Sequence, residues 1–86
     1  MYIRSNIMEE YLDTIKQIIA DLHPELDGED RDGLVADGIL DSYDIITIIT
    51  QLADEFDAVI TADKITPENF DSARSIAELV DEILNG

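Results

Sequence analysis

The chain has 86 residues and no cysteine, so neither a disulfide nor a thiolate metal site can support its fold. It also lacks tryptophan and has only two prolines, three tyrosines and two phenylalanines. The core must therefore form mainly from aliphatic side chains. An apolar fraction of 45% is sufficient for that, and the length predicts one small domain over residues 1–86.

Basic residues are scarce. Five lysines and arginines stand against 21 aspartates and glutamates, which gives a formal net charge of −16 at pH 7. Such a surface repels the phosphates of nucleic acids and anionic membranes, so no nucleic acid is expected as a partner. The same charge attracts basic patches on other proteins and speeds their encounter.

Long apolar runs are missing as well. No stretch approaches the length of a transmembrane helix and no signal-peptide pattern is present, so we expect a monomeric cytoplasmic protein with no membrane span. Residues 1–6 are expected to form a ragged N-terminal lead-in.

Apolar residues recur at helical spacing in a first segment at about 7–22 and a last one at about 72–84. His23 and Pro24 are expected to end the first helix, because a residue before proline disfavours the helical region. Ser72 is the expected N-cap of the last helix. The inward residues of the two helices are Ile7, Tyr11, Ile15, Ile18, Ile19 and Leu22, and Ile76, Leu79, Val80, Ile83 and Leu84.

A middle segment runs from Ser42 to about Phe56. Its β-branched run at 45–50 is also compatible with a buried strand, but the length of the apolar pattern and the serine at its start favour a helix. Residues 67–70 predict a short fourth helix, with Thr66 as cap. The sequence therefore predicts an all-α fold, a small four-helix bundle of three longer helices and one short helix.

A long loop, from about 23 to 41, is expected between the first two helices. Loops of this length are uncommon in compact domains and are often functional. Five apolar residues are expected to pin it to the core: Leu26, Leu34, Val35, Ile39 and Leu40.

Ser42 is the main candidate functional residue, at the point where a glycine-containing loop meets a helix. Serine is a favoured N-cap, and a helix N-terminus favours negative charge, so a phosphodiester on Ser42 would be well placed. Asp41 and Asp44 would repel a phosphate, and they are better explained as contacts for a basic, metal-dependent modifying enzyme. Alternatively, Ser42 is only an N-cap and the two aspartates are ordinary first-turn acids.

Residues 37–52 read Asp-Gly-Ile-Leu-Asp-Ser-Tyr-Asp-Ile-Ile-Thr-Ile-Ile-Thr-Gln-Leu. This stretch resembles the attachment site of the acyl carrier protein family. The order of elements, the acidity and the stretch 65–72 are also similar, so the resemblance covers about 7–84. It implies that Ser42 carries 4′-phosphopantetheine, transferred from coenzyme A with Mg²⁺, and that the chain is not an enzyme but a carrier of an acyl or aminoacyl thioester.

The resemblance also implies partners. Asp41 and Asp44 match family acids that assist recognition, and Tyr43 matches a residue that contacts partners. The expected partners are a phosphopantetheinyl transferase, a ligase that loads the acyl or aminoacyl group, and a downstream transferase, all with basic patches. The cargo is expected either to swing free or to lie against an apolar face formed by Ile45, Ile49, Ile65 and Leu79.

The chain departs from the family pattern in two ways. Fatty-acid and peptidyl carriers usually have glycine three residues before the serine, whereas here Ile39 occupies that place and Gly38 precedes it. The aromatic after the serine is closer to D-alanyl carriers and some stand-alone carriers. The middle helix is also poor in acids, since Thr47 and Thr50 stand where acids often cluster. Both departures leave the cargo open.

Other functions fit the residues less well. A serine hydrolase would need a relay, but the only histidine, His23, is expected to be a solvated helix end, and no Gly-x-Ser-x-Gly motif exists. The acidic loop 27–33 fails both possible EF-hand registers, so no metal site is predicted. An acidic helical module that binds proteins without a prosthetic group remains the alternative.

Overall fold

Three α-helices form the body of the protein. The computed structural model describes residues 3–27 and 31–86. Its α-helices are α1 (Ile3–Leu22), α2 (Ser42–Phe56) and α3 (Ala73–Asn85), and two 3-10 helices, η1 (Pro24–Leu26) and η2 (Ala62–Lys64), lie in the connections. No strand occurs in the described residues, so the prediction of an all-α fold is confirmed, and residues 45–50 are helical rather than extended.

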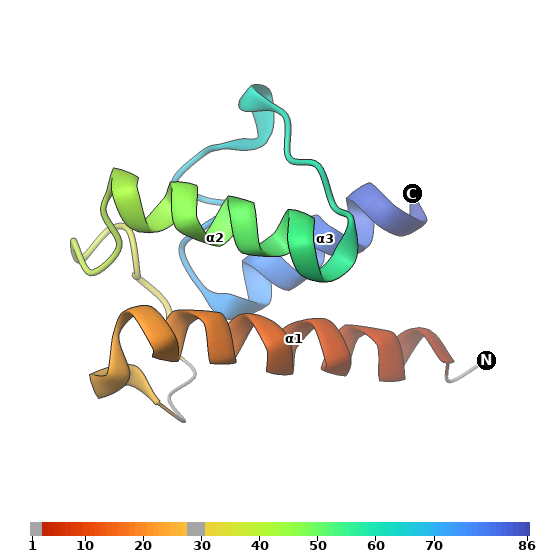
Figure 1. The fold of residues 1–86 in the computed structure, drawn as a ribbon, viewed down its shortest axis with the longest axis horizontal. Helices are drawn as coiled ribbons and strands as arrows, with labels where there is room; N and C mark the ends of the chain where they lie inside the picture. The colour runs from red at the N-terminus through yellow and green to blue at the C-terminus, as the bar shows by residue number, and fades with distance from the viewer. Residues whose placement is uncertain (1–2, 28–30) are drawn as a thin grey trace.

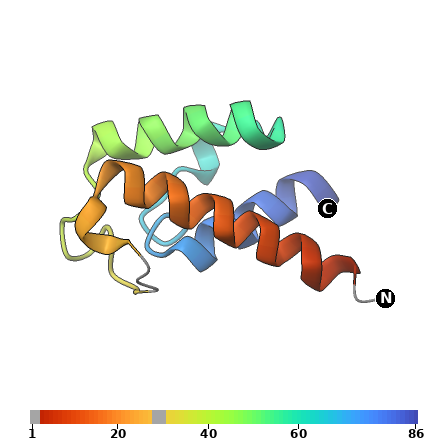
Figure 2. The same ribbon diagram turned by 60° about the horizontal axis from the view of Figure 1, so that its bottom comes forward.

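Helix α1 packs against both α2 and α3, and more extensively against α3 (Figures 1 and 2). It runs antiparallel to both, so that the end of α1 and the start of α2 lie together at one end of the molecule (Figure 1). The start of α1 and the end of α3 lie at the other end (Figures 1 and 2). This arrangement brings residues near 23 next to residues near 42.

The core is aliphatic, with one fully buried aromatic ring. Each fully buried leucine, isoleucine, valine or phenylalanine side chain contributes about 1.5–3 kcal/mol to the stability of the fold, because its apolar surface is removed from water. Tyr11 and Phe56 add an edge-to-face contact between α1 and α2, with ring centroids 5.1 Å apart. The largest fully buried side chains are Phe70, Ile15, Ile48, Leu52, Ile76 and Val80.

Apart from the N-cap of α2, the helix ends follow the sequence signals with two exceptions. Helix α1 ends at Leu22, directly before His23 and Pro24, and Ser72 caps α3 by accepting a hydrogen bond from the Ser75 N–H at 3.0 Å, both as predicted. The first exception is the start of α1, which lies at Ile3 rather than near residue 7. Residues 3–6 therefore belong to the helix and not to a ragged lead-in.

The second exception lies in the connection between α2 and α3. Residues 67–70 form a hydrogen-bonded turn rather than a short helix, because the N–H groups of Asn69 and Phe70 bond to Thr66 and Pro67 and the pattern then stops. Thr66 does cap this turn, since its hydroxyl oxygen accepts from the Asn69 N–H at 3.3 Å. The short helix of this connection is η2 instead.

The loop between η1 and α2 is packed on the core as predicted. Leu26, Leu34 and Leu40 are buried, while Val35 and Ile39 are half-buried against the same cluster. The backbone N–H groups of Ile39 and Leu40 both donate to the carbonyl of Leu34, at 3.0 and 2.9 Å. These bonds form a turn at residues 34–40, which leads directly into α2.

Candidate functional site

Asp41, not Ser42, caps helix α2. Asp41 has an extended backbone (φ −102°, ψ −176°), and its carboxylate accepts the N–H of Asp44 at 2.9 Å. In return, the Asp44 carboxylate accepts the N–H of Asp41 at 3.4 Å. The prediction that Ser42 is the N-cap is therefore wrong by one residue. The reason is that Asp41 has the non-helical conformation of a cap, whereas Ser42 already lies in the first turn.

Because Asp41 caps the helix, the hydroxyl of Ser42 is not used by the fold. Ser42 is exposed, and its side chain makes no hydrogen bond to the residues that the structure describes. Helix geometry also leaves the N–H groups of Ser42 and Tyr43 without an intrahelical acceptor. An anionic group on the Ser42 oxygen would meet these donors and the positive end of the helix dipole.

Asp44 occupies a different environment from Asp41. It is half-buried, and its Oδ2 lies 2.8 Å from Nε2 of His23 at the end of α1. The other ring nitrogen of His23, Nδ1, lies 3.2 Å from Oε2 of Glu25. The expectation that His23 is a solvated helix end is therefore wrong, because the antiparallel packing of α1 and α2 brings its ring to the first turn of α2.

These contacts change the charge state of His23. The hydrogen bond to the Asp44 carboxylate raises the pKa of His23 above its ordinary value of 6.5, and Glu25 acts in the same direction. Partial burial of the ring opposes this rise. His23 thus carries positive charge at a higher pH than a free histidine does.

Two apolar side chains stand exposed beside Ser42. Tyr43 is 75% exposed and Ile46 is 61% exposed, and they lie three residues apart on one face of α2. On the same helix, Thr47 and Thr50 donate their hydroxyls to the carbonyls of Tyr43 and Ile46, both at 3.0 Å. Beyond Asp41 and Asp44, the exposed surface of α2 next to Ser42 therefore includes an apolar pair, Tyr43 and Ile46.

Of the four predicted site residues, Asp41, Ser42 and Tyr43 are exposed together at the start of α2. Asp44 faces His23 instead, so only part of its carboxylate remains accessible to another molecule.

Asp71 is a further important residue of this region, and no sequence pattern indicates its role. Its carboxylate accepts the backbone N–H groups of Gly33, Val35 and Ala36, at 3.2, 3.1 and 3.1 Å, and its carbonyl accepts that of Leu34 at 2.8 Å. The bonds from Ala36, Val35 and Gly33 lower the pKa of Asp71 below its ordinary value of 3.8. Asp71 thus fastens the loop before Ser42 to the start of α3.

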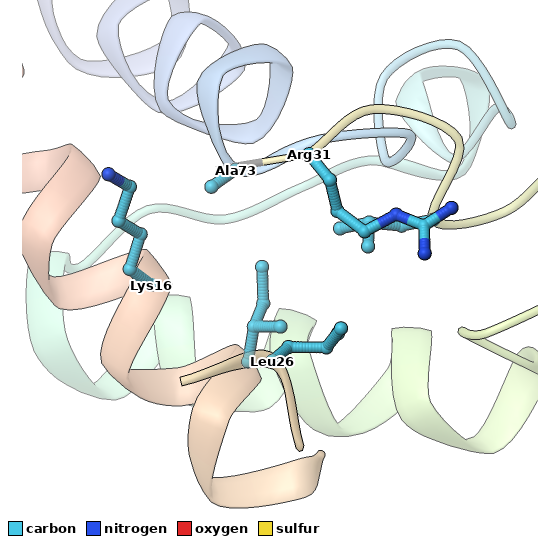
Figure 3. Close-up of a pocket in the computed structure, with 6 residues that line it drawn as sticks. Lys16, Leu26, Arg31 and Ala73 are labelled. Atoms are coloured by element: carbon cyan, nitrogen blue, oxygen red, sulfur yellow. The ribbon is translucent and has the colours of Figure 1, made fainter. Parts of the chain in front are cut away.

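The predicted cargo face is largely used by the fold. Ile45 and Ile49 are half-buried against the core and Leu79 is 3% exposed, whereas Ile65 is 42% exposed. A small pocket elsewhere lies between α1, the loop and the start of α3, near Lys16, Leu26, Arg31 and Ala73 (Figure 3). The volume of this pocket is about 10 Å³, which is about the least that a single water molecule needs and is too small for an acyl chain.

Within residues 3–27 and 31–86, no group of three or more His, Asp or Glu side chains is placed to hold a metal ion. No helix of this part of the chain is long and apolar enough to cross a bilayer. The acidic stretch considered for calcium includes residues 28–30, which lie outside the described part.

No family model matches the chain. A comparison with curated proteins gives no match either. The hypothesis of an attachment site at Ser42 therefore depends on its motif and on the geometry described above.

Proposed function

We propose that this protein is a carrier that bears 4′-phosphopantetheine on Ser42 and moves an acyl or aminoacyl group between enzymes as a thioester. The observation that supports the proposal best is that Asp41, and not Ser42, is the N-cap of α2. Asp41 caps the helix, so the neighbouring serine is exposed, unbonded within the described residues, and located where helix N–H groups favour an anion.

The chemistry of attachment suits this position. In the transfer, a bond forms between the Ser42 oxygen and the β-phosphorus of coenzyme A. The phosphoanhydride bond breaks, adenosine 3′,5′-bisphosphate leaves, and the serine proton passes to a base of the transferase. When attached, the prosthetic group supplies a thiol, which this cysteine-free chain lacks.

We propose that Asp41, Tyr43 and Ile46 form the contact surface for partner enzymes. Tyr43 and Ile46 offer exposed apolar area, and the net charge of −16 favours partners with basic surfaces. The expected partners are a phosphopantetheinyl transferase, an acyl- or aminoacyl-loading ligase and a downstream transferase. The cytoplasm, which holds coenzyme A, is the expected location.

We further propose that a short cargo stays near the surface. The face predicted for it is already packed, apart from the partly exposed Ile65. A long acyl chain would have to displace Ile45 and Ile49 from the core. This favours small acyl or aminoacyl groups, as the similarity to D-alanyl carriers also does.

The experiment is co-expression with a promiscuous phosphopantetheinyl transferase, followed by intact-mass measurement. We expect the chain to gain one phosphopantetheine mass and Ser42→Ala to gain none. Thr50→Ala, an exposed hydroxyl removed from the same helix, is the matched control and should be modified fully. A wild-type chain that stays unmodified would contradict the proposal.

The alternative is an acidic helical module that binds proteins without a prosthetic group. The neighbouring exposed side chains of Tyr43 and Ile46 favour it, since a contiguous exposed apolar patch is typical of a protein-binding site. The same mass measurement separates the two functions, because such a module gains no mass.

A further inference from the structure

His23 connects the end of α1 to the residues on either side of Ser42. Its Nε2 lies 2.8 Å from Asp44 Oδ2, and the same oxygen accepts the Asp41 N–H at 3.4 Å. Asp41 in turn accepts the N–H of Asp44 at 2.9 Å. A continuous set of contacts therefore links the imidazole to the capping box that encloses Ser42.

Among residues 3–27 and 31–86, the charged groups that contact the ring come from two elements. Asp44 approaches from α2, with Asp41 behind it, and Glu25 approaches from η1. On α1 itself the nearest acid in the sequence, Asp21, accepts a hydrogen bond from Gln17 at 3.1 Å. The ring thus faces carboxylates, and its side chain is only 23% exposed, which limits screening by water.

An anion on Ser42 needs such a partner. The first turn of α2 offers N–H donors, but Asp41 and Asp44 place two negative charges next to the same oxygen. Like charges this close destabilise each other. A positive imidazolium in contact with Asp44 offsets one of them.

We propose that His23 is a positioning residue for the Ser42 site: it holds Asp44 in the capping box and, when protonated, favours a negatively charged group on Ser42. This inference rests on the proposed function and adds to it a dependence on pH. Protonation of His23 and attachment of the phosphodiester then assist each other to the same extent, because coupling between two sites is reciprocal.

The sign of the pH dependence follows from the contacts of the ring. The pKa of His23 is raised in the folded chain. The stabilisation that the protonated ring gives to the fold is therefore complete below pH 6.5 and is lost as the pH rises through the raised pKa. A phosphodiester on Ser42 adds a negative charge beside Asp44, the partner of the ring, so it should raise the pKa of His23 further.

The test is an NMR titration of the His23 ring in four forms of the chain: unmodified, phosphopantetheinylated, Ser42→Glu and Ser42→Gln. We expect a higher pKa in the modified chain than in the unmodified one, and in Ser42→Glu than in Ser42→Gln. Asp44→Asn should lower the pKa of His23 more than Glu25→Gln does, because the contact with Asp44 is shorter and less exposed.

The glutamate and glutamine pair keeps this test independent of the transferase. Equal pKa values in that pair would overturn the inference, since they would show that a negative charge at residue 42 does not interact with the protonated ring of His23. If the wild-type chain is never modified but the pair differs, the proposed function fails while the electrostatic link between His23 and residue 42 stands.

Discussion

Asp41 and Ser42 have different roles at the start of α2. The aspartate satisfies the helix N-terminus, and the serine is left exposed in the first turn. A hydroxyl engaged in capping would have to give up its hydrogen bond before it could be modified. At the residue scale, this division makes Ser42 accessible without loss of helix stability.

The loss of the Asp41 cap and the loss of the Ser42 hydroxyl should therefore have different effects on the free energy of unfolding. We expect Asp41→Ala to lower the free energy of unfolding by about 1 kcal/mol, the usual cost of losing an N-cap. Asp41→Asn should retain most of the stability because asparagine caps equally well, and Ser42→Ala should be nearly neutral. Urea denaturation measures all three, and a larger loss for Ser42→Ala than for Asp41→Ala would contradict the assignment.

The position of Ser42 was predictable, but its surroundings were only partly so. Aspartate and serine are both good caps, and the choice between them depends on the backbone angles at the end of a loop that the sequence does not define. The contact of His23 with Asp44 joins residues 21 positions apart. No local pattern indicates it, because it exists only once α1 and α2 pack side by side.

At the scale of elements, the loop before α2 depends on one carboxylate. The Asp71 carboxylate, just before α3, accepts hydrogen bonds from the N–H groups of Gly33, Val35 and Ala36. Gly33 and Gly38 have positive φ angles of 79° and 76°, which allow the chain to turn at these residues. These bonds connect the described part of the loop, residues 31–41, to the start of α3. They limit how far the segment that leads to Ser42 can move relative to α3.

Asp71→Ala should release this loop. We expect amide exchange at Gly33, Val35 and Ala36 to accelerate by roughly tenfold, since each loses its acceptor. In the wild-type chain the pH dependence of the same amide signals should report a carboxyl group with a lowered pKa. The stabilisation by the Asp71 carboxylate is complete above its ordinary pKa of 3.8 and is lost as the pH falls through the lowered pKa.

Glu68→Gln is the matched control, as it removes an exposed acid three residues earlier in the same connection. It should change neither the exchange nor the titration. An equal effect of the two substitutions would show that general charge, and not the contacts of Asp71, orders the loop.

The elements themselves were largely predictable because their apolar spacing and end signals agree. His23-Pro24 and Ser72 mark ends that the structure confirms. Residues 67–70 carry a good start signal in Thr66 and Pro67, but the buried Phe70 and the loop contacts of Asp71 require the chain to turn there. Asp71 itself has no local signal, since its partners lie 35–38 residues away.

At the scale of the whole molecule, charge opposes compactness. Acids outnumber bases by sixteen, so most acids have no base to pair with, and ion pairs such as that of Lys64 with Glu82, at 3.4 Å, offset little of the repulsion. The small aliphatic core must hold the fold against this self-repulsion.

Added salt should therefore stabilise the protein. Screening of about 1 kcal/mol of repulsion would raise the Tm by roughly 4–8 °C in a chain of this size, and Mg²⁺ should act at lower concentration than Na⁺. Thermal denaturation between low and moderate salt measures the effect. The double variant Asp54→Asn, Glu55→Gln, at two exposed positions, should melt higher in low salt and respond less. A Tm that is independent of salt would contradict the expectation.

The antiparallel arrangement of α1 with α2 and α3 has a practical consequence. The beginning of α1 and the end of α3 lie at one end of a body whose longest dimension is 37 Å, and the start of α2 lies at the opposite end (Figure 1). Ser42 is the first residue of α2. A fluorophore, an affinity handle or a fused enzyme attached behind Gly86 would leave the serine facing open solution. Immobilised in that orientation on a sensor surface, the chain presents its hydroxyl to any enzyme flowed past it.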